Sequence, residues 1–185
     1  MAHSANKSTK SADTLEMTDY FPNEYMESAY SIDYEALYRK GFRGIIFDID
    51  NTLVPHGADC TPRADALFRH LTRIGFKTLL LSNNNAERVE RFNRTIGTLA
   101  ISDASKPATD SFHEAMRQLG TNSGNTLMIG DTIHTDILGA NRAGLNSILV
   151  KYIGYYDKGR KGLRRKLESA ILLFFPLIHR RRRIL

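Results

Sequence analysis

The chain has 185 residues, of which 42% are hydrophobic and 25% are charged, and its formal net charge is +6. These values are typical of a globular protein, and a chain of this length can bury one hydrophobic core without added cross-links. The single cysteine, Cys60, excludes an intramolecular disulfide and a metal site built from cysteines, and we expect it to be a loop residue ahead of a helix.

Residues 1–14 are rich in Ser, Lys, Ala and Asn, so we expect this segment to be disordered. It lacks the apolar core of a signal peptide, which predicts that the protein is not secreted. No stretch of the chain reaches the roughly 20 apolar residues that span a bilayer. We therefore expect a location on the cytoplasmic or organelle-matrix side of a membrane, with peripheral membrane contact left open.

An aromatic series between residues 20 and 38 precedes the first strongly apolar run of the chain. Its members are Tyr20, Phe21, Tyr25, Tyr30, Tyr34 and Tyr38. This spacing predicts a helical segment packed on the domain, and a surface patch of aromatic side chains is the alternative.

From Gly44 onward, short apolar runs alternate with amphipathic stretches. The runs that predict strands are residues 44–47, 77–81, 99–101, 126–129 and 147–150, and the stretches that predict helices are 61–73, 85–94, 107–120 and 134–142. Thr61 with Pro62, and Asn85, are typical helix starts. Strands that alternate with helices predict an α/β fold in which helices flank both faces of an open parallel sheet.

Polar side chains stand directly after three of these predicted strands. Asp48, Ser82 and Asp131 each follow an apolar run. Because the carboxyl ends of parallel strands meet at one edge of the sheet, where ligands bind, we expect these three side chains to lie together.

Asp48 and Asp50 bring two carboxylates to the end of one buried strand. Like charges so placed are unfavourable unless a positive charge lies between them. A divalent cation would supply it, and oxygen-only ligands suit Mg²⁺ better than Zn²⁺. The alternative is an Asx-turn or a helix cap, which Asp commonly forms after a strand.

The segment from Ser82 to Asn85 places a hydroxyl and amides before a helix, where free N–H groups can bind an anion. A simple capping loop would have the same sequence. Lys106 precedes Pro107 at a predicted helix start, where the helix dipole disfavours a cation. A phosphate facing Lys106 would explain it, although a lone lysine is usually solvated.

Asp131 and Asp136 are spaced across a loop that enters a helix. Asp136 could merely stabilise the start of that helix, whereas Asp131, after a glycine, is harder to explain structurally. We expect His134 to be a surface or capping residue and leave the role of His56 open.

The ordered set of segments resembles the four motifs of the haloacid dehalogenase (HAD) phosphatases. The matching elements are DxDxT from Asp48 to Thr52, Ser82, Lys106, and GDxxxxD from Gly130 to Asp136. The resemblance covers roughly residues 41–150. Within the superfamily the chain is similar to the YqeG-type, class IIIA branch, which is related to phosphatidylglycerophosphate phosphatases. The segments that carry this likeness are residues 21–25, 31–33, 40–41, 50–54, 82–85, 106–107 and 135–139.

The resemblance implies a Rossmann-like HAD fold and a phosphatase mechanism. Asp48 would attack phosphorus to form an aspartyl-phosphate, and Asp50 would protonate the leaving oxygen and then activate water. The implied Mg²⁺ ligands are Asp48, the backbone carbonyl of Asp50, and Asp131, with Asp136 supporting. The implied phosphate-binding residues are Thr52, Ser82, Asn83 and Lys106.

The intervals from Asp50 to Thr61 and from Ser82 to Lys106 are too short for a large cap domain. An open site favours a substrate that is large or fixed to a surface. We expect residues 15–157 to form the phosphatase domain and 158–185 a basic tail with an apolar stretch at 170–178, suited to an anionic membrane surface. The alternative is a tail packed on the core.

The leading hypothesis is dephosphorylation of phosphatidylglycerophosphate to phosphatidylglycerol. A soluble phosphatase acting on a nucleotide or a sugar phosphate is the second. A third, from another class, is an RNA-associated binding protein with a vestigial site, which the arginine run at 180–183 would permit. The intact acidic residues and Lys106 argue against it, as does the lack of an aromatic-rich RNA-binding motif, so we do not expect nucleic acid to be a partner.

Overall fold

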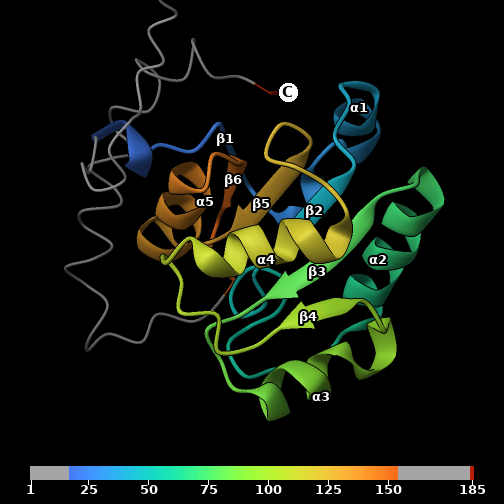
Figure 1. The fold of residues 1–185 in the computed structure, drawn as a ribbon. Helices are drawn as coiled ribbons and strands as arrows, with labels where there is room; N and C mark the ends of the chain where they lie inside the picture. The colour runs from blue at the N-terminus through green and yellow to red at the C-terminus, as the bar shows by residue number, and fades with distance from the viewer. Residues whose placement is uncertain (1–16, 154–183) are drawn as a thin grey trace, which may run out of the picture.

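The computed structural model describes residues 17–153 and 184–185. They form a parallel six-stranded sheet in the order β1-β6-β5-β2-β3-β4 (Figure 1). The strands are β1 (Glu24–Met26), β2 (Gly44–Phe47), β3 (Lys77–Leu81), β4 (Leu99–Ile101), β5 (Thr126–Gly130) and β6 (Asn146–Val150). The predicted α/β class and open parallel sheet are confirmed.

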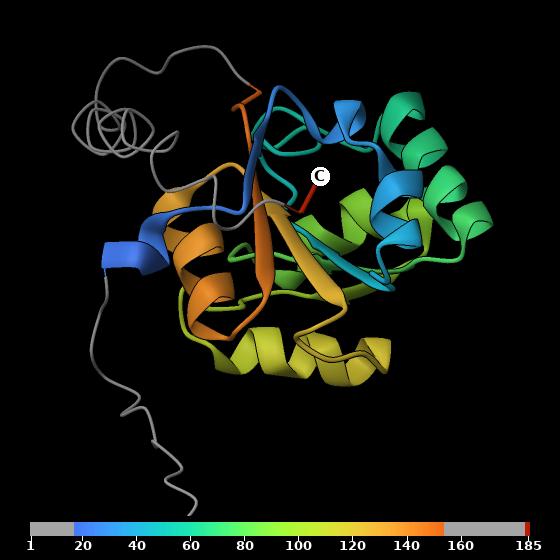
Figure 2. The ribbon, with the colours of Figure 1, turned by 90° about the horizontal axis from the view of Figure 1, so that it is seen from above.

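Helices cover both faces of this sheet. The helices are α1 (Tyr34–Arg39), α2 (Pro62–Ile74), α3 (Ala86–Ile96), α4 (Asp110–Leu119) and α5 (Leu138–Arg142). Figure 2 shows α1 and α2 on one side and α4 and α5 on the other. A hydrophobic core lies on each face of the sheet. Alternate residues of β2 contribute to one core or the other, because successive side chains of a strand point to opposite faces. Ile45 and Phe47 pack with α2 and α3, whereas Ile46 packs with α4 and α5.

The centre of the sheet sets the position of the predicted site. Phe47 of β2 pairs with Leu80 of β3 on one side and with Ile129 of β5 on the other. The next residue, Asp48, donates its backbone N–H to the Ile129 carbonyl at 3.0 Å. Asp48 and Asp131 therefore emerge at neighbouring points of one edge, as the strand pattern predicts.

The helix predicted for residues 20–38 is wrong over most of its length. A 3-10 helix ends at Tyr20, β1 pairs with β6, and only Tyr34–Arg39 is α-helical. The side-chain carbonyl of Asn23 accepts a hydrogen bond from the Ser147 backbone at 2.8 Å, so contacts distant in sequence draw this segment into the sheet. The expected core packing is found for Tyr34, which is 2% exposed, but Tyr25 is 40% exposed.

The predicted starts of two helices are confirmed. The Thr61 hydroxyl accepts from the Ala64 amide at 3.2 Å, and the Asn85 side chain accepts from the Arg88 amide at 3.0 Å. The helix predicted to open at Pro107 starts later, at Asp110, because residues 106–109 form a turn. Lys106 therefore does not lie at a helix N-terminus, and its position needs another explanation.

No domain is inserted at the site edge within residues 48–106, all of which are described. The chain between β2 and α2 is a loop, and between β3 and Lys106 it forms only α3 and β4. The absence of a large cap domain is as predicted. In the described part of the chain, no helix has the length and apolar character needed to cross a membrane.

The predictions for residues 1–14 and 158–183 lie outside the described residues. Ile184 and Leu185 are described, and both pack against the hydrophobic core. Their backbone amides each donate to the buried Glu24 carboxylate at 2.8 Å. At the end of β6, the Ile153 amide donates to the Asn51 carbonyl at 2.8 Å.

Candidate active site

Three carboxylates converge at the carboxyl edge of the central strands. Asp48, Asp131 and Asp136 each present an oxygen, and these atoms lie within 4.8 Å of one another. The ammonium group of Lys106 lies against them, 2.8 Å from Asp48 Oδ1 and 2.7 Å from Asp136 Oδ1. It also donates to the Leu81 carbonyl at 2.7 Å. The carboxylates, and not a helix end, explain the position of this lysine.

The electrostatic balance keeps Lys106 charged. Its side chain is only 2% exposed, and burial by itself would lower its pKa. The neighbouring Asp136 and Asp48 outweigh burial and raise the pKa of Lys106 above its usual value. The lysine is thus a permanent positive charge between two carboxylates.

One lysine does not neutralise the whole cluster. Burial raises the pKa of Asp48 to about 6 against the opposing effect of Lys106, and Asp136 adds to the rise. Burial also raises the pKa of Asp131 to about 8, with further contributions from Asp136 and Asp48. The site therefore has an excess of negative charge, and its donors are all oxygen. This donor set fits a hard divalent cation.

The Asp136 side chain reaches the cluster because it lies directly against the backbone of Gly130 and Thr132. Residues Ile133–Ile137 form a π-helical turn, and Asp136 Oδ2 accepts from the Thr132 amide at 3.1 Å. A Cβ atom at residue 130 would collide with the Asp136 side chain, so only glycine fits there. The GDxxxxD spacing thus brings both carboxylates to one place.

The residues predicted to bind phosphate lie around this cluster. The fully buried Thr52 donates its hydroxyl hydrogen to Asp131 Oδ1 at 3.3 Å, and Ser82 follows β3 with its hydroxyl accepting from the Asn84 backbone amide at 3.1 Å. Asn83 uses both ends of its amide on the Lys106 backbone, at 3.0 and 2.7 Å. The Asn83 side chain therefore positions Lys106.

The carboxylate of Asp50 has a separate set of partners. Its Oδ1 accepts from the Gly57 amide at 2.7 Å and from Arg88 at 2.9 Å, and its Oδ2 accepts from Asn84 at 2.6 Å. Sequence reasoning missed both Asn84 and Arg88 as neighbours of Asp50. Asn84 lies within the polar run after β3, but Arg88 has the appearance of an ordinary solvated helix residue.

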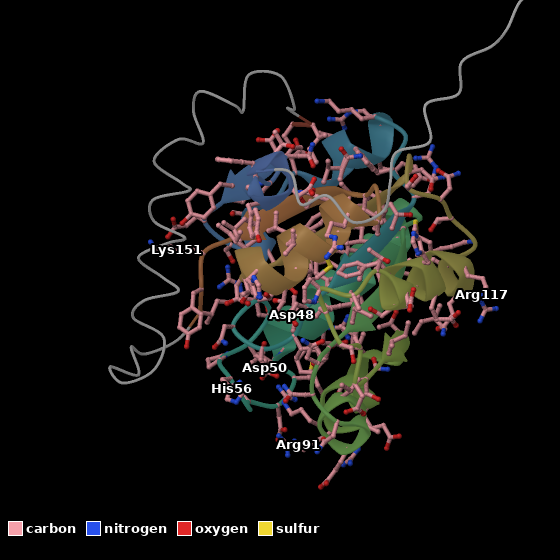
Figure 3. The ribbon with its side chains drawn as sticks, turned by 60° about the vertical axis from the view of Figure 1, so that its left-hand side comes forward. Asp48, Asp50, His56, Arg91, Arg117 and Lys151 are labelled. Carbon is pink, nitrogen blue, oxygen red and sulfur yellow. The ribbon has the colours of Figure 1, made fainter. Side chains whose placement is uncertain are left out.

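The two histidines differ in their surroundings. His134 is exposed, as predicted. His56 is also exposed, and its Nδ1 lies 3.8 Å from Asp50 Oδ1. Figure 3 shows Asp48, Asp50 and His56 in succession, with Arg91 of α3 farther along the same side.

Comparisons with known proteins agree with this geometry. Residues 103–162 match the family model described as HAD-hydrolase-like. The chain is 34% identical over 154 residues to the probable phosphatase YqeG of Bacillus subtilis, an alignment that covers 83% of this chain and 90% of YqeG. It is 28% identical over 140 residues to the chloroplastic/mitochondrial phosphatidylglycerophosphate phosphatase 1 of Arabidopsis thaliana, covering 70% of this chain but only 40% of that protein.

Solved structures share the fold at lower identity. An uncharacterized protein from Listeria monocytogenes superposes with a TM-score of 0.52 at 20% identity, covering 71% of this chain and 98% of the other. The cobalt-bound deoxy-D-mannose-octulosonate 8-phosphate phosphatase of Haemophilus influenzae gives 0.51 at 17% identity, covering 76% and 92%. With the fold, the identity to YqeG and the family match in agreement, the chain belongs to the HAD superfamily, in the family that includes YqeG, and is a HAD-type phosphatase.

Proposed function

We propose that this protein hydrolyses phosphate monoesters through an aspartyl-phosphate formed on Asp48, with Mg²⁺ as its cofactor. The observation that carries the proposal is the position of Asp48. Its carboxylate follows β2, lies 2.8 Å from the Lys106 ammonium, and shares the cluster with Asp131 and Asp136. A nucleophile next to a fixed cation is suited to phosphoryl transfer, in which negative charge must be offset.

The reaction has two steps. In the first, a carboxylate oxygen of Asp48 bonds to phosphorus while the bond to the leaving oxygen breaks, and Asp50 donates its proton to that oxygen. In the second, Asp50 takes a proton from water, and the water oxygen attacks phosphorus and displaces Asp48. Inorganic phosphate leaves, and Asp50 is protonated again.

The acidic cluster is the proposed Mg²⁺ site. Asp48, Asp131 and the backbone carbonyl of Asp50 would hold the ion, with Asp136 in support. When bound, Mg²⁺ offsets negative charge on the phosphoryl oxygens. The elevated pKa values of Asp48 and Asp131 support this assignment, because a cation would favour their charged forms.

Three residues are proposed to bind the transferring phosphoryl group directly, and a fourth, Asn83, to support Lys106. The Lys106 ammonium would neutralise its charge, and the hydroxyls of Ser82, directly after β3, and of Thr52, four residues after Asp48, would donate to it. Asn83 would act by holding the Lys106 backbone. Rigid donors of this kind stabilise charge that develops in the transition state.

We propose phosphatidylglycerophosphate as the substrate, with phosphatidylglycerol as the product. The absence of a cap within residues 48–106 supports a substrate too large to be enclosed. Two relatives named phosphatidylglycerophosphate phosphatase 1, from Arabidopsis thaliana and Chlamydomonas reinhardtii, are each 28% identical to this chain. The chain covers 40% and 48% of their lengths.

The test is Mg²⁺-dependent phosphate release from phosphatidylglycerophosphate in anionic vesicles, beside a panel of soluble nucleotide and sugar phosphates. Asp48→Asn is the control. Faster phosphate release from the lipid than from the soluble esters, together with loss of that release in Asp48→Asn, would support both the reaction and the substrate. Preference for a soluble ester would retain the mechanism and refute the lipid assignment, whereas activity that persists in Asp48→Asn would refute the nucleophile.

We further propose that residues 15–157 form the catalytic domain and that the basic segment from residue 158 contacts anionic membrane. The charges of Lys158 to Lys166 and Arg180 to Arg183 support this, because anionic lipid attracts clustered basic residues. Changing the four arginines at 180–183 to glutamine should weaken vesicle binding while leaving turnover of a soluble ester unchanged. Unaltered binding would refute the membrane contact.

A further inference from the structure

Arg88 of α3 is buried at the site edge in a way that phosphate binding does not explain. Its side chain is 9% exposed, and Nη2 donates to Asp50 at 2.9 Å and to the Ala58 carbonyl at 2.8 Å. Among the residues that the structure describes, its buried Nε and Nη1 have no hydrogen-bond partner. The guanidinium carbon lies 5.6 Å from the centre of the Phe92 ring.

Such an arrangement is not needed for stability alone. Burying a guanidinium group is unfavourable, and leaving some of its N–H groups unpaired adds to that penalty. A buried ion pair can often be replaced by apolar side chains of similar volume with no loss of stability. The contact with Asp50 therefore calls for a functional reason.

The partners of Asp50 fix the direction of its carboxylate. Gly57, Asn84 and Arg88 all donate to this carboxylate, and together they engage both of its oxygens. A carboxylate held through both oxygens keeps one orientation, and a proton is transferred efficiently only when the donor and acceptor atoms are correctly placed.

We propose that Arg88 is a positioning residue that acts through Asp50. It holds the Asp50 carboxylate where the two proton transfers occur. This inference rests on the proposed role of Asp50 and adds a residue outside the four motifs.

Arg91, one turn farther along α3, provides a matched control. It donates to the Gly57 carbonyl at 2.9 Å and pairs with Asp59 at 2.8 Å, and its side chain is 43% exposed. Arg88 and Arg91 thus hold the same loop, residues 57–59, and both come from one face of α3. Of these two arginines, only Arg88 contacts Asp50 in the described structure, so the two variants separate an effect on the loop from an effect on the carboxylate.

The leaving group distinguishes a positioning role from a structural one. An alkoxide leaving group needs a proton as the bond to phosphorus breaks, whereas a nitrophenolate leaves readily without one. A misplaced Asp50 should therefore slow alkyl esters more than aryl esters. The quantity to compare is kcat/KM, because it reports the free energy from free enzyme and substrate to the transition state.

The experiment measures phosphate release from 4-nitrobenzyl phosphate and 4-nitrophenyl phosphate, two esters of similar size. Arg88→Met should lower kcat/KM roughly 100-fold for the benzyl ester and less than about 10-fold for the phenyl ester. Arg88→Lys should fall between Arg88→Met and the unchanged protein. Arg91→Met should change both substrates by the same factor. Equal losses on the two esters in Arg88→Met would overturn the proposal.

A double variant gives an independent readout. If Arg88 acts through Asp50, adding Arg88→Met to Asp50→Asn should lower kcat/KM by less than about threefold. If the two residues act independently, the loss in the double variant should equal the product of the losses in the two single variants, and that result would refute the positioning role. If Arg88→Met does not fold, as judged by its melting transition, Arg88→Lys is measured against the same two criteria. Inactivity of Asp48→Asn together with equal losses at Arg88 would refute this inference and leave the proposed function standing.

Discussion

Replacing Lys106 by methionine should both destabilise the protein and inactivate it. The ammonium group lies 2.8 Å from one carboxylate and 2.7 Å from another. At an effective dielectric constant of about 20, each pair contributes about 6 kcal/mol of attraction. Desolvation of the buried charges opposes this by several kcal/mol, so loss of the lysine should cost about 3–5 kcal/mol.

The destabilisation should depend on pH in a defined direction. Without Lys106, the negative charges of the cluster repel one another with less compensation, and protonation of Asp48 and Asp131, whose pKa values are raised, relieves that repulsion. The loss of stability should therefore be larger at pH 8 than at pH 5.5. Phosphate release should fall by at least about 10²-fold, because a charge that stabilises the transition state is removed.

The assay is urea unfolding of the metal-free protein at both pH values, analysed by linear extrapolation. Lys151→Met is the control, since this exposed lysine pairs with Glu27 at 2.7 Å and its loss should cost no more than about 1 kcal/mol. If Lys106→Met stays within about 1 kcal/mol of the unchanged protein at pH 8, the charge-balance reasoning is wrong.

Three further predictions concern the same edge. Asp48→Asn should abolish turnover yet raise the melting temperature of the metal-free protein, because burial and Asp136 outweigh the attraction of Lys106 and make the Asp48 charge unfavourable on balance; a lower melting temperature would contradict this. The pKa values of Asp48 and Asp131, about 6 and about 8, exceed the ordinary 3.8, so metal-free stability should fall as pH rises from about 4 to about 8. Added Mg²⁺ should then raise the melting temperature more at pH 8 than at pH 6, and an equal rise at both would contradict the assignment. Gly130→Ala should cost about 1–3 kcal/mol in urea unfolding because its methyl group meets Asp136, and a neutral result would show that the loop can shift.

The sheet and the meeting of the acidic residues could be predicted because both follow from local pattern. The apolar runs before Asp48 and Asp131 are long enough for buried strands, and parallel strands must end at a common edge. The sequence also predicts Lys106 near a phosphate site, but on the assumption that it lies at the start of a helix, which is wrong because α4 starts at Asp110. A turn holds it, and the attraction of Asp48 and Asp136 fixes its side chain.

What could not be predicted depends on contacts between distant parts of the chain. Strand β1 exists because it pairs with β6, and its own sequence, Glu24–Met26, has little strand character. The pairing of Arg88 with Asp50 joins residues 38 positions apart. Helical periodicity places Arg88 on the face of α3 that carries Val89 and Phe92, but the local sequence does not show which group its charge would meet there.

The attachment points at Ile153 and Ile184 have a consequence for whatever binds the intervening residues. Ile153 is fastened to Asn51, the neighbour of Asp50, and Ile184 is fastened to Glu24 on the edge strand. The described chain thus ends next to the loop that carries Asp50, so a surface that binds the residues directly after Ile153 would be linked to the reaction centre by a short tether. Phosphate esters on that surface would meet Asp48 at a high effective concentration, so turnover there could exceed turnover of the same ester free in solution without any tighter intrinsic binding.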